Sequence, residues 1–274
     1  MKIAVLSGKG GTGKTTVSTS LAFLSKNLLI DTDVEAPNSH LFLKCDDVKK
    51  TPVYTYYPVV DMEKCTLCKA CGDFCRYNAI IPGKNKVIVF EESCHYCGGC
   101  EIVCRFGAIS WGKREIGNIL EGTTYFGSSM KYGRLNIGEM SGVKIIKELY
   151  KNNCSKDMII DCPPGTSCST VASLEGVDFA IVVTESTPFG LSDMKLVISL
   201  LRDLHIPFGV VINKKSNDEV EKWCSKENIE VLGEIPFDRD IAKRYSNGEI
   251  VADALVEYQG AFENILKKVK EYGN

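Results

Sequence analysis

The sequence predicts an α/β fold with a mainly parallel sheet flanked by helices and interrupted by a small inserted α+β domain. Apolar, strand-like runs recur along the chain at 2–6, 28–31, 158–161, 179–184, 208–213 and 231–235. Helical patterns lie between several of them, at about 14–25, 143–151, 192–204 and 218–227. This alternation is typical of βαβ units, whose strands lie parallel in one sheet.

The alternation stops between about residues 62 and 112, where cysteines and short turns replace the long periodic segments. We therefore predict a discontinuous main domain, 1–61 with 113–274, and an inserted domain at 62–112. The glycine-rich stretch 113–142 predicts short strands and a loop. Near the C-terminus, Phe262, Ile265, Leu266 and Val269 share one helical face, which we expect to pack on the sheet rather than on a membrane.

Size and charge exclude several classes of protein. With 274 residues and 44% hydrophobic residues, the chain can bury a full α/β core. The formal net charge of −2 predicts no general affinity for nucleic acid. No apolar run approaches the roughly 18 residues that would span a bilayer, and residues 1–7 do not resemble a signal peptide. We expect a cytoplasmic protein with no membrane association.

A glycine-rich loop follows the first predicted strand and precedes the first predicted helix. It contains the pattern G-x-x-x-x-G-K-[ST], with Gly8, Gly13, Lys14 and Thr15 in the defining places. In such a loop the backbone N–H groups surround phosphate oxygens, the lysine neutralises β/γ charge and the hydroxyl holds Mg²⁺. The loop also satisfies G-x-G-x-x-G, but the phosphate loop explains this match, so it is no evidence for a dinucleotide.

Eight of the 13 cysteines form two copies of C-x2-C-x2-C-x3-C, within 65–80 and 94–109. Such a run supplies three thiolates to one [4Fe-4S] cluster and its fourth thiolate to the other. The first cluster would be held by Cys65, Cys68, Cys71 and Cys104, and the second by Cys94, Cys97, Cys100 and Cys75. Two zinc sites are the alternative, although such sites usually pair separated C-x2-C knuckles.

The insert resembles the bacterial two-cluster ferredoxins, which implies a ferredoxin-like domain. It departs from them in one respect, because Arg76 and Arg105 follow the fourth cysteines where that family usually has proline. Ligation should be unaffected. The added positive charge would favour a reduced, more negative cluster.

The loop sequence G-K-G-G-T-G-K-T resembles the deviant Walker A ATPases, a group that includes MinD, ParA, Mrp-type carriers and the nitrogenase iron protein. The resemblance covers nearly the whole chain and implies a P-loop NTPase sheet. It also implies that Lys9 crosses the interface of an ATP-dependent homodimer, that Asp33 positions the attacking water and that Asp161 is the Walker B carboxylate. With Lys14, these three would form the hydrolytic set.

The same resemblance, together with the loop pattern, assigns the nucleotide contacts, with Thr15 also holding Mg²⁺. Asn213 and Pro236 would contact the adenine. The complete set is Gly8, Lys9, Gly10, Gly11, Thr12, Gly13, Lys14, Thr15, Thr16, Asn213 and Pro236.

Five cysteines lie outside the two runs. Cys45, Cys154 and Cys224 are interpreted as small buried hydrophobic residues. Cys162 and Cys168 fall in the segment that resembles switch II of the nitrogenase iron protein, where a cysteine ligates a cluster shared between subunits. A free thiol near the phosphate loop is the simpler interpretation of Cys168.

Two hypotheses about function follow. The first is a slow, partner-stimulated, Mg²⁺-dependent ATPase that gates electron transfer or iron–sulfur or metallocofactor assembly on a partner protein. The second is a MinD-like positioning or regulatory ATPase in which the clusters are structural or sense redox state. A stand-alone oxidoreductase is disfavoured, because no flavin or nicotinamide fingerprint accompanies the cysteines.

Overall fold

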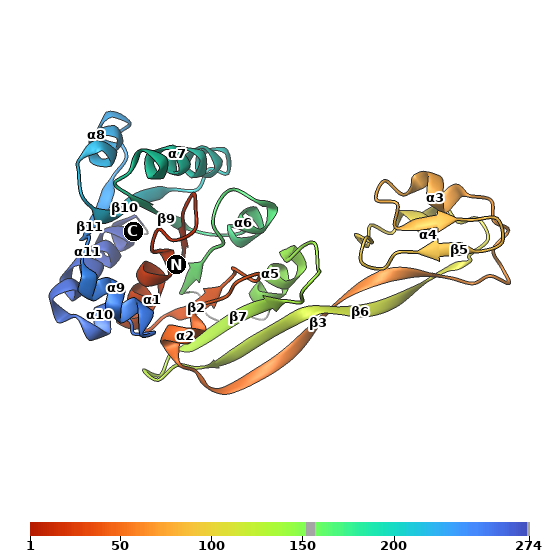
Figure 1. The fold of residues 1–274 in the computed structure, drawn as a ribbon, viewed down its shortest axis with the longest axis horizontal. Coiled ribbons are helices and arrows are strands. Elements are labelled where there is room, and N and C mark those ends of the chain that lie inside the picture. Colours follow the sequence, from red (N-terminus) through yellow and green to blue (C-terminus); the bar gives the residue numbers. More distant parts are fainter. Residues whose placement is uncertain (152–156, 273–274) are drawn as a thin grey trace.

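A computed structural model describes residues 1–151 and 157–272. Its centre is a nine-stranded sheet in the order β11-β10-β9-β1-β8-β2-β7-β6-β3 (Figure 1). The seven strands from β11 to β7 pair parallel, whereas β6 is antiparallel to both β7 and β3. The prediction of a mainly parallel sheet flanked by helices is confirmed.

The strands begin and end close to their predicted positions, except in the region before and after the insert. The parallel strands are β1 (Lys2–Leu6), β2 (Leu28–Asp31), β7 (Ser129–Leu135), β8 (Met158–Asp161), β9 (Phe179–Glu185), β10 (Phe208–Lys215) and β11 (Val231–Pro236). The antiparallel strands are β3 (Asp46–Val60) and β6 (Ile109–Thr123).

Side chains of the central strands alternate between two cores, as a sheet covered on both faces requires. On one face, Val5 and Ile181 pack with α1 (Lys14–Ser25), α10 (Val251–Ala254) and α11 (Val256–Glu271). The predicted face of α11 lies in this core: Phe262, Ile265, Leu266 and Val269 are all buried.

On the other face, Ile30 and Val182 pack with the helices α5 (Val143–Tyr150), α7 (Pro188–Asp203) and α8 (Glu219–Lys226). Helix α7 begins four residues before the predicted start, because Thr187 caps it by accepting a hydrogen bond from Gly190 N–H. The short helix α6 (Cys168–Ser173) packs against α5. Two further helices are α2 (His40–Leu43) and α9 (Arg239–Ser246).

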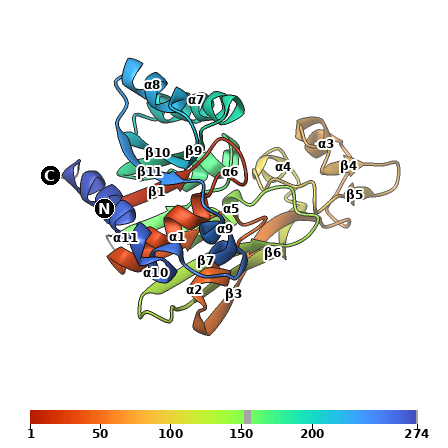
Figure 2. The same ribbon diagram turned by 60° about the vertical axis from the view of Figure 1, so that its left-hand side comes forward.

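Residues 113–142 were expected to form short strands, and this expectation is wrong for β6. Both β6 and β3 are 15 residues long, and they pair from Asp46↔Thr123 to Val60↔Ile109. Only Gly117–Thr123 of β6 also pairs with β7. The remainder of the two strands extends past the sheet as a two-stranded ribbon (Figures 1 and 2).

The direction of this ribbon follows from the strand pairing. Because β3 is antiparallel to β6 and β6 is antiparallel to β7, β3 runs in the same direction as the parallel strands. Its end at Val60 therefore lies beyond their carboxyl edge, which is where α/β sheets bind ligands.

Residues 61–108 form a small unit at the end of the ribbon, outside the nine-stranded sheet (Figure 1). The unit contains α3 (Ala70–Phe74), α4 (Gly99–Ile102) and the antiparallel pair β4 (Ile80–Pro82) and β5 (Val87–Val89). Its small core is built around Ile80, Cys100 and Ile109. Among the described residues, no helix is both long and apolar enough to cross a bilayer.

Candidate functional site

The phosphate loop connects β1 to α1. Gly13 is the N-cap of α1 with φ 95°, and a Cβ there would lie 2.1 Å from Asn213 Nδ2. Glycine is therefore required at this position on two grounds, left-handed backbone and close packing. No side chain caps the helix, so its first N–H groups remain available to an anion at the positive end of the helix dipole.

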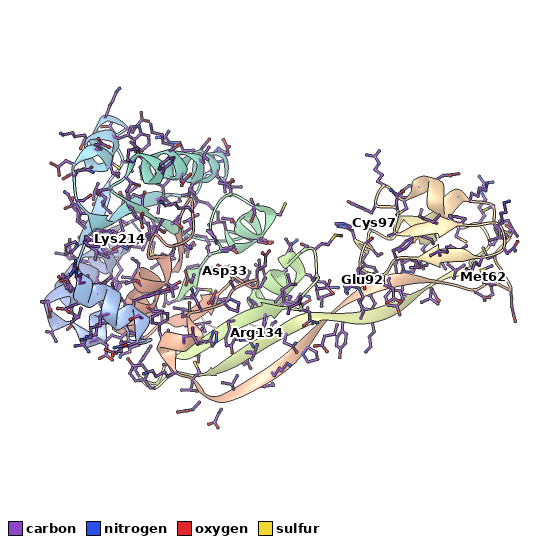
Figure 3. The ribbon with its side chains drawn as sticks, in the orientation of Figure 1. Asp33, Met62, Glu92, Cys97, Arg134 and Lys214 are labelled. Atoms are coloured by element: carbon purple, nitrogen blue, oxygen red, sulfur yellow. The ribbon has the colours of Figure 1, made fainter. Side chains whose placement is uncertain are left out.

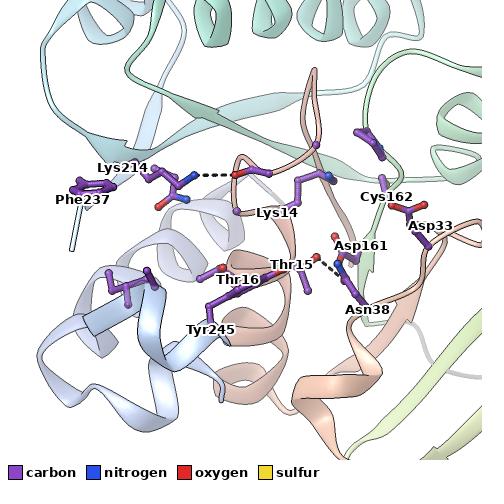
Figure 4. A pocket seen from close by; sticks show the side chains of 18 of the residues that line it. Lys14, Thr15, Thr16, Asp33, Asn38, Asp161, Cys162, Lys214, Phe237 and Tyr245 are labelled. Carbon is purple, nitrogen blue, oxygen red and sulfur yellow. Dashed lines mark hydrogen bonds between the residues drawn. The ribbon is translucent and has the colours of Figure 1, made fainter. Parts of the chain in front are cut away.

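A cavity of about 350 Å³ opens beside this loop, at the carboxyl edge of the sheet (Figure 4). This volume lies within the range of small-molecule and cofactor sites. Its lining residues are Gly10, Gly11, Gly13, Lys14, Thr15, Thr16, Asp33, Ala36, Asn38, Asp161, Cys162, Pro164, Asn213, Lys214, Pro236, Phe237, Asp238, Ile241, Ala242 and Tyr245.

The polar end of the cavity has the oxygen ligands that suit Mg²⁺. Thr15 Oγ1 donates to Asn38 Oδ1 at 2.9 Å, and Ser39 Oγ donates to Asp161 Oδ2 at 2.8 Å. The second oxygen of Asp161, Oδ1, is buried without a hydrogen-bond partner among the described residues. A buried carboxylate oxygen without a partner is costly. A hydrated divalent cation beside Thr15 would give Asp161 Oδ1 such a partner.

Three aspartates, Asp31, Asp33 and Asp161, lie close together at this end of the cavity, and their negative charges repel one another. Burial raises the pKa of Asp31 to about 7, and the negative charge of Asp161 adds to the effect. Burial also raises the pKa of Asp161 and Asp33, while the nearby Lys14 ammonium counteracts it in both. A bound divalent cation would relieve the same repulsion.

Asp31 also organises the loop that follows β2. One of its carboxylate oxygens accepts from the N–H groups of Asn38 at 3.1 Å and Ser39 at 3.0 Å, and the other accepts from Asp33 N–H at 3.0 Å. The buried end of β2 thus fixes both the predicted water-positioning residue and the two residues that contact Thr15 and Asp161.

Three residues of the predicted nucleotide set lie outside the cavity lining. Gly8 packs tightly on Asp193, and a Cβ there would approach the Asp193 backbone to 2.4 Å. Thr12 is buried, and its carbonyl accepts from Asn213 Nδ2 at 2.7 Å. Lys9 is partly exposed and forms an ion pair with Glu185 at 3.4 Å.

The sequence interpretation missed several residues at the site. At the end opposite Asp161, the cavity is bounded by Lys214, Phe237 and Tyr245 (Figure 4). Lys214 Nζ donates to Gly11 O at 2.9 Å and also pairs with Glu185 at 2.6 Å. Asn38 and Ser39 were also missed, although polar residues soon after a strand that ends in a carboxylate were a usable signal.

The insert contains two further cavities, each lined by four cysteines. One is lined by Cys65, Cys68, Cys71 and Cys104, and the other by Cys75, Cys94, Cys97 and Cys100. These sets coincide with the division of ligands expected for two clusters, in which the fourth cysteine of each run joins the other run. We call them the first and the second cysteine cavity.

The two cysteine loops have the same backbone conformation at equivalent positions. Leu67 and Lys69 in the first loop, like Tyr96 and Gly98 in the second, have φ between 49° and 77°. Backbone N–H groups donate to sulfur at 3.4 Å twice, from Tyr96 to Cys94 and from Ala108 to Cys104. N–H donors stabilise thiolates, so these two sulfurs of the second run, one in each cysteine cavity, fit anionic ligands.

Among residues 1–151 and 157–272, no group of three or more His, Cys, Asp or Glu is placed to hold a single metal ion. Zinc would draw its thiolates to about 2.3 Å from one centre. In neither cysteine set do the described thiols converge on one such centre, and each set lines a small cavity of about 20 Å³.

The five cysteines outside the two runs lie outside the insert. Cys162 lies at the floor of the nucleotide cavity, fully buried, and burial raises the pKa of its thiol. Cys168 is exposed at the start of α6. Cys224 is buried and Cys45 is half-buried, whereas Cys154 lies outside the described residues.

A phosphate loop, two strand-end carboxylates and a cavity at the carboxyl edge of a parallel sheet together define a P-loop nucleotide-binding protein. Residues 3–251 match the CobQ/CobB/MinD/ParA nucleotide binding domain, and the chain belongs to this family.

Curated relatives extend over nearly all of the chain. The uncharacterized protein MJ0578 of Methanocaldococcus jannaschii is 35% identical over 281 residues, which cover 99% of this chain and 97% of that protein. An iron-sulfur cluster carrier protein of Aquifex aeolicus is 23% identical over 293 residues, 98% of this chain and 67% of the carrier.

Solved structures share the fold. The cell division ATPase MinD of Pyrococcus furiosus gives a TM-score of 0.61 at 20% identity, with 98% of each chain covered. MinD of Pyrococcus horikoshii, solved with Mg-ADP, gives 0.60 at 21% identity and covers 100% of this chain and 97% of that one.

Proposed function

We propose that this chain is a Mg²⁺-dependent ATPase whose nucleotide state gates the action of the cysteine insert on a partner protein, by electron transfer or by iron–sulfur or metallocofactor assembly. One observation carries the proposal. Two four-cysteine cavities lie on a ribbon that projects past the edge of the sheet where the nucleotide cavity opens.

Each part of the nucleotide cavity has a distinct chemical role. The α1 N-terminus and Lys14 would neutralise the phosphates, and Thr15 and Asp161 would orient the cation. Asp33 lines the cavity from the adjacent strand end and would orient a water for in-line attack. Asn213 and Pro236 also line the cavity, and the adenine would lie against them.

In the second cysteine cavity, aromatic side chains support the cysteine loop. The rings of Tyr77 and His95 stack at 3.8 Å, and both residues line the cavity. A bound [4Fe-4S] cluster would supply one-electron redox chemistry or serve as cargo for assembly. The protein's contribution would be to hold the eight thiolates and, at the second cavity, to pack these aromatic side chains beside them.

The partner and the oligomeric state are part of the proposal. We infer an ATP-dependent homodimer in which Lys9 leaves Glu185 and reaches the nucleotide of the other subunit. Lys214 pairs with the same carboxylate at 2.6 Å, so Glu185 would keep a partner after Lys9 leaves. The name of the Aquifex aeolicus relative, an iron-sulfur cluster carrier protein, supports a partner in redox or metallocofactor chemistry.

The proposal is tested by iron and sulfide analysis of anaerobically purified protein. We expect about eight iron atoms per chain, since two [4Fe-4S] clusters are proposed. Cys68→Ser and Cys97→Ser should each reduce the iron content, because each removes a ligand of a different cluster. Cys168→Ser, an exposed cysteine outside both cavities, is the matched control and should leave the iron content unchanged. Zinc in place of iron would contradict the proposal.

A further inference from the structure

The two cysteine cavities lie at unequal distances from the ATPase body. Figure 3 shows Cys97 and Glu92 on the side of the insert that faces the body, and Met62 toward the far end. Cys97 lines the second cavity, whereas the first cavity includes Cys65, three residues after Met62. The second cysteine cavity is therefore the nearer of the two.

The loop of the nearer cavity is held by residues that belong to the body or to the ribbon. Arg114 Nε, on β6, donates to Glu91 O at 3.2 Å, and the guanidinium also pairs with Glu139. Lys144 Nζ, on α5, lies 5.0 Å from the ring centre of Tyr56 and 5.4 Å from that of Tyr96. Ammonium groups at such distances are attracted by an aromatic face.

Tyr96 connects these contacts to the cysteines themselves. It lies between Cys94 and Cys97, and its N–H donates to Cys94 Sγ at 3.4 Å. Its ring packs on Tyr56 and, edge-on, on Trp111, with centroids 4.9 Å apart in each pair. A displacement of Lys144 would consequently act on the peptide that binds a cysteine sulfur.

Glu139 and Lys144 belong to residues 136–150, which we call the link segment. It lies against the loop that carries Asp33: Leu135 N–H, directly before the segment, donates to Val34 O at 2.8 Å, and a Cβ on Gly142 would lie 2.2 Å from Val34 Cγ2. Val34 directly follows Asp33, so a shift of the Asp33 loop on nucleotide binding would press on the link segment.

The end of the link segment lies against the other nucleotide-sensing loop. Tyr150 O–H donates to Ser173 O, on α6, at 2.6 Å. Helix α6 follows directly on the Asp161–Ser167 loop, whose Gly165 N–H donates at 2.8 Å to Ser7 O, directly after β1 at the start of the phosphate loop. The loop that carries Asp33 thus touches the link segment directly, and the Asp161–Ser167 loop is connected to it through α6.

The contacts of the first cysteine loop are different. Cys65 N–H donates to Asp61 O at 3.0 Å, and Lys64 pairs with Asp61 at 3.1 Å, all within or at the base of the insert. The two loops are alike in sequence and backbone, and they differ in their attachment to the body.

We propose that nucleotide state is transmitted selectively to the second cysteine loop, through Glu139 and Lys144 of the link segment. Glu139 and Lys144 are positioning residues, which act through Arg114 and Tyr96. This inference rests on the proposed function and adds which of the two cluster sites responds to ATP. Coupling of this kind requires a shared element with two arrangements, and the link segment is that element.

The test is hydrogen–deuterium exchange of the iron-loaded protein, with Mg-ADP and with Mg²⁺ and a non-hydrolysable ATP analogue. Peptides from 91–104 and 62–75 are compared, because they are equivalent windows of the two repeats. We expect exchange in 91–104 to differ at least about threefold between nucleotides, while 62–75 changes little. Equal changes in both windows, or a change confined to 62–75, would overturn the inference.

Substitutions in the link segment test whether Lys144 and Glu139 transmit the nucleotide-dependent change to residues 91–104. Lys144→Ala and the milder Glu139→Gln should each abolish most of the difference at 91–104, with iron content and nucleotide affinity retained. Lys147→Ala is the matched control, because Lys147 is exposed one turn further along α5. If Lys147→Ala has the same effect, or if both link variants leave the difference intact, Lys144 and Glu139 do not carry the signal.

The same preparations separate this inference from the proposed function. Absence of iron would refute the proposed clusters themselves. Iron-loaded protein with nucleotide-dependent delivery to an acceptor, but with no selective change at 91–104, would refute only the inference.

Discussion

Asp33 is half-buried in the cavity lining, where the Lys14 ammonium and the Asp161 carboxylate both act on its charge. Burial raises the pKa of its carboxyl, and Lys14 opposes that shift. Under the proposed function, this carboxylate, held on a loop that Asp31 fixes, would orient the attacking water.

Asp33→Asn should bind ATP with nearly the wild-type affinity and lose most hydrolysis, on the order of 10²-fold. The amide keeps the size of the side chain but cannot accept the proton or orient the water in the same way. Phosphate release under saturating ATP, with affinity from a fluorescent nucleotide, measures both. Glu35→Gln is the control, since Glu35 is exposed on the same loop and does not line the cavity. Full hydrolysis by Asp33→Asn would remove Asp33 from the mechanism.

Lys9→Ala should weaken ATP-dependent dimerisation and leave the iron content intact. The substitution removes the ion pair with Glu185, but Lys214 continues to neutralise that carboxylate, so the folded monomer should lose little stability. Sedimentation velocity with ADP and with a non-hydrolysable ATP analogue gives the answer. Normal dimers in the variant would show that Lys9 does not bridge subunits.

Among individual site residues, the local sequence predicts those that a motif places on one short segment. Lys14, Thr15 and Asp161 were predicted and line the cavity, as do Asn213 and Pro236. Tyr245 and Phe237 were not predicted, because they belong to the C-terminal elements whose packing over the cavity is decided by tertiary structure.

Among the elements, β3 shows most clearly what sequence periodicity misses. The strand begins with Asp46, Asp47, Lys49 and Lys50 and contains Pro52 and Pro58, a composition that does not resemble a buried strand. It is the edge strand of the sheet, where charges and proline are tolerated because one side of the backbone is unpaired. The parallel strands other than β7, in contrast, were predicted to within two residues.

Helix α11 covers one face of the sheet, and a glycine substitution in it tests how the helix contributes to stability. Gly260→Ala should raise the free energy of unfolding by about 0.5–1 kcal/mol, because Gly260 is exposed in the helix and a Cβ there meets nothing within 4 Å. Urea unfolding of the nucleotide-free protein measures the change. A lower free energy of unfolding would contradict the packing described for this helix.

Gly233→Ala is the companion substitution on β11, beneath the same helix. A Cβ there would lie 2.7 Å from Ile265 Cγ1, so the expected change is destabilising, typically about 1–3 kcal/mol for an overpacked core. The two glycine variants should therefore shift the unfolding midpoint in opposite directions.

For the whole molecule, the ribbon makes the insert removable in principle. Val60 pairs with Ile109 at its end, so replacing residues 61–108 with Asn-Gly should close β3 and β6 as a hairpin. The shortened chain should fold and bind Mg-ADP, because the cavity lining contains no residue of the insert, and it should contain no iron. Loss of nucleotide binding would show that the body depends on the insert.

The arrangement of the two sites could be predicted only in part. Motif spacing indicated a nucleotide site and two four-cysteine sets, and both cysteine cavities have the expected composition. The ribbon, its direction and the contacts of Lys144 could not be predicted, because they depend on strand register and on pairs far apart in the chain.

The central claim is that nucleotide state at the phosphate loop changes the cysteine insert. Electron paramagnetic resonance of anaerobically purified, dithionite-reduced protein, with and without ATP and Mg²⁺, tests it most directly. We expect the signal of two reduced [4Fe-4S] clusters, altered when nucleotide binds. A reduced signal that is identical in both conditions, or a cluster signal that resists reduction, would contradict the gating and favour clusters that are structural.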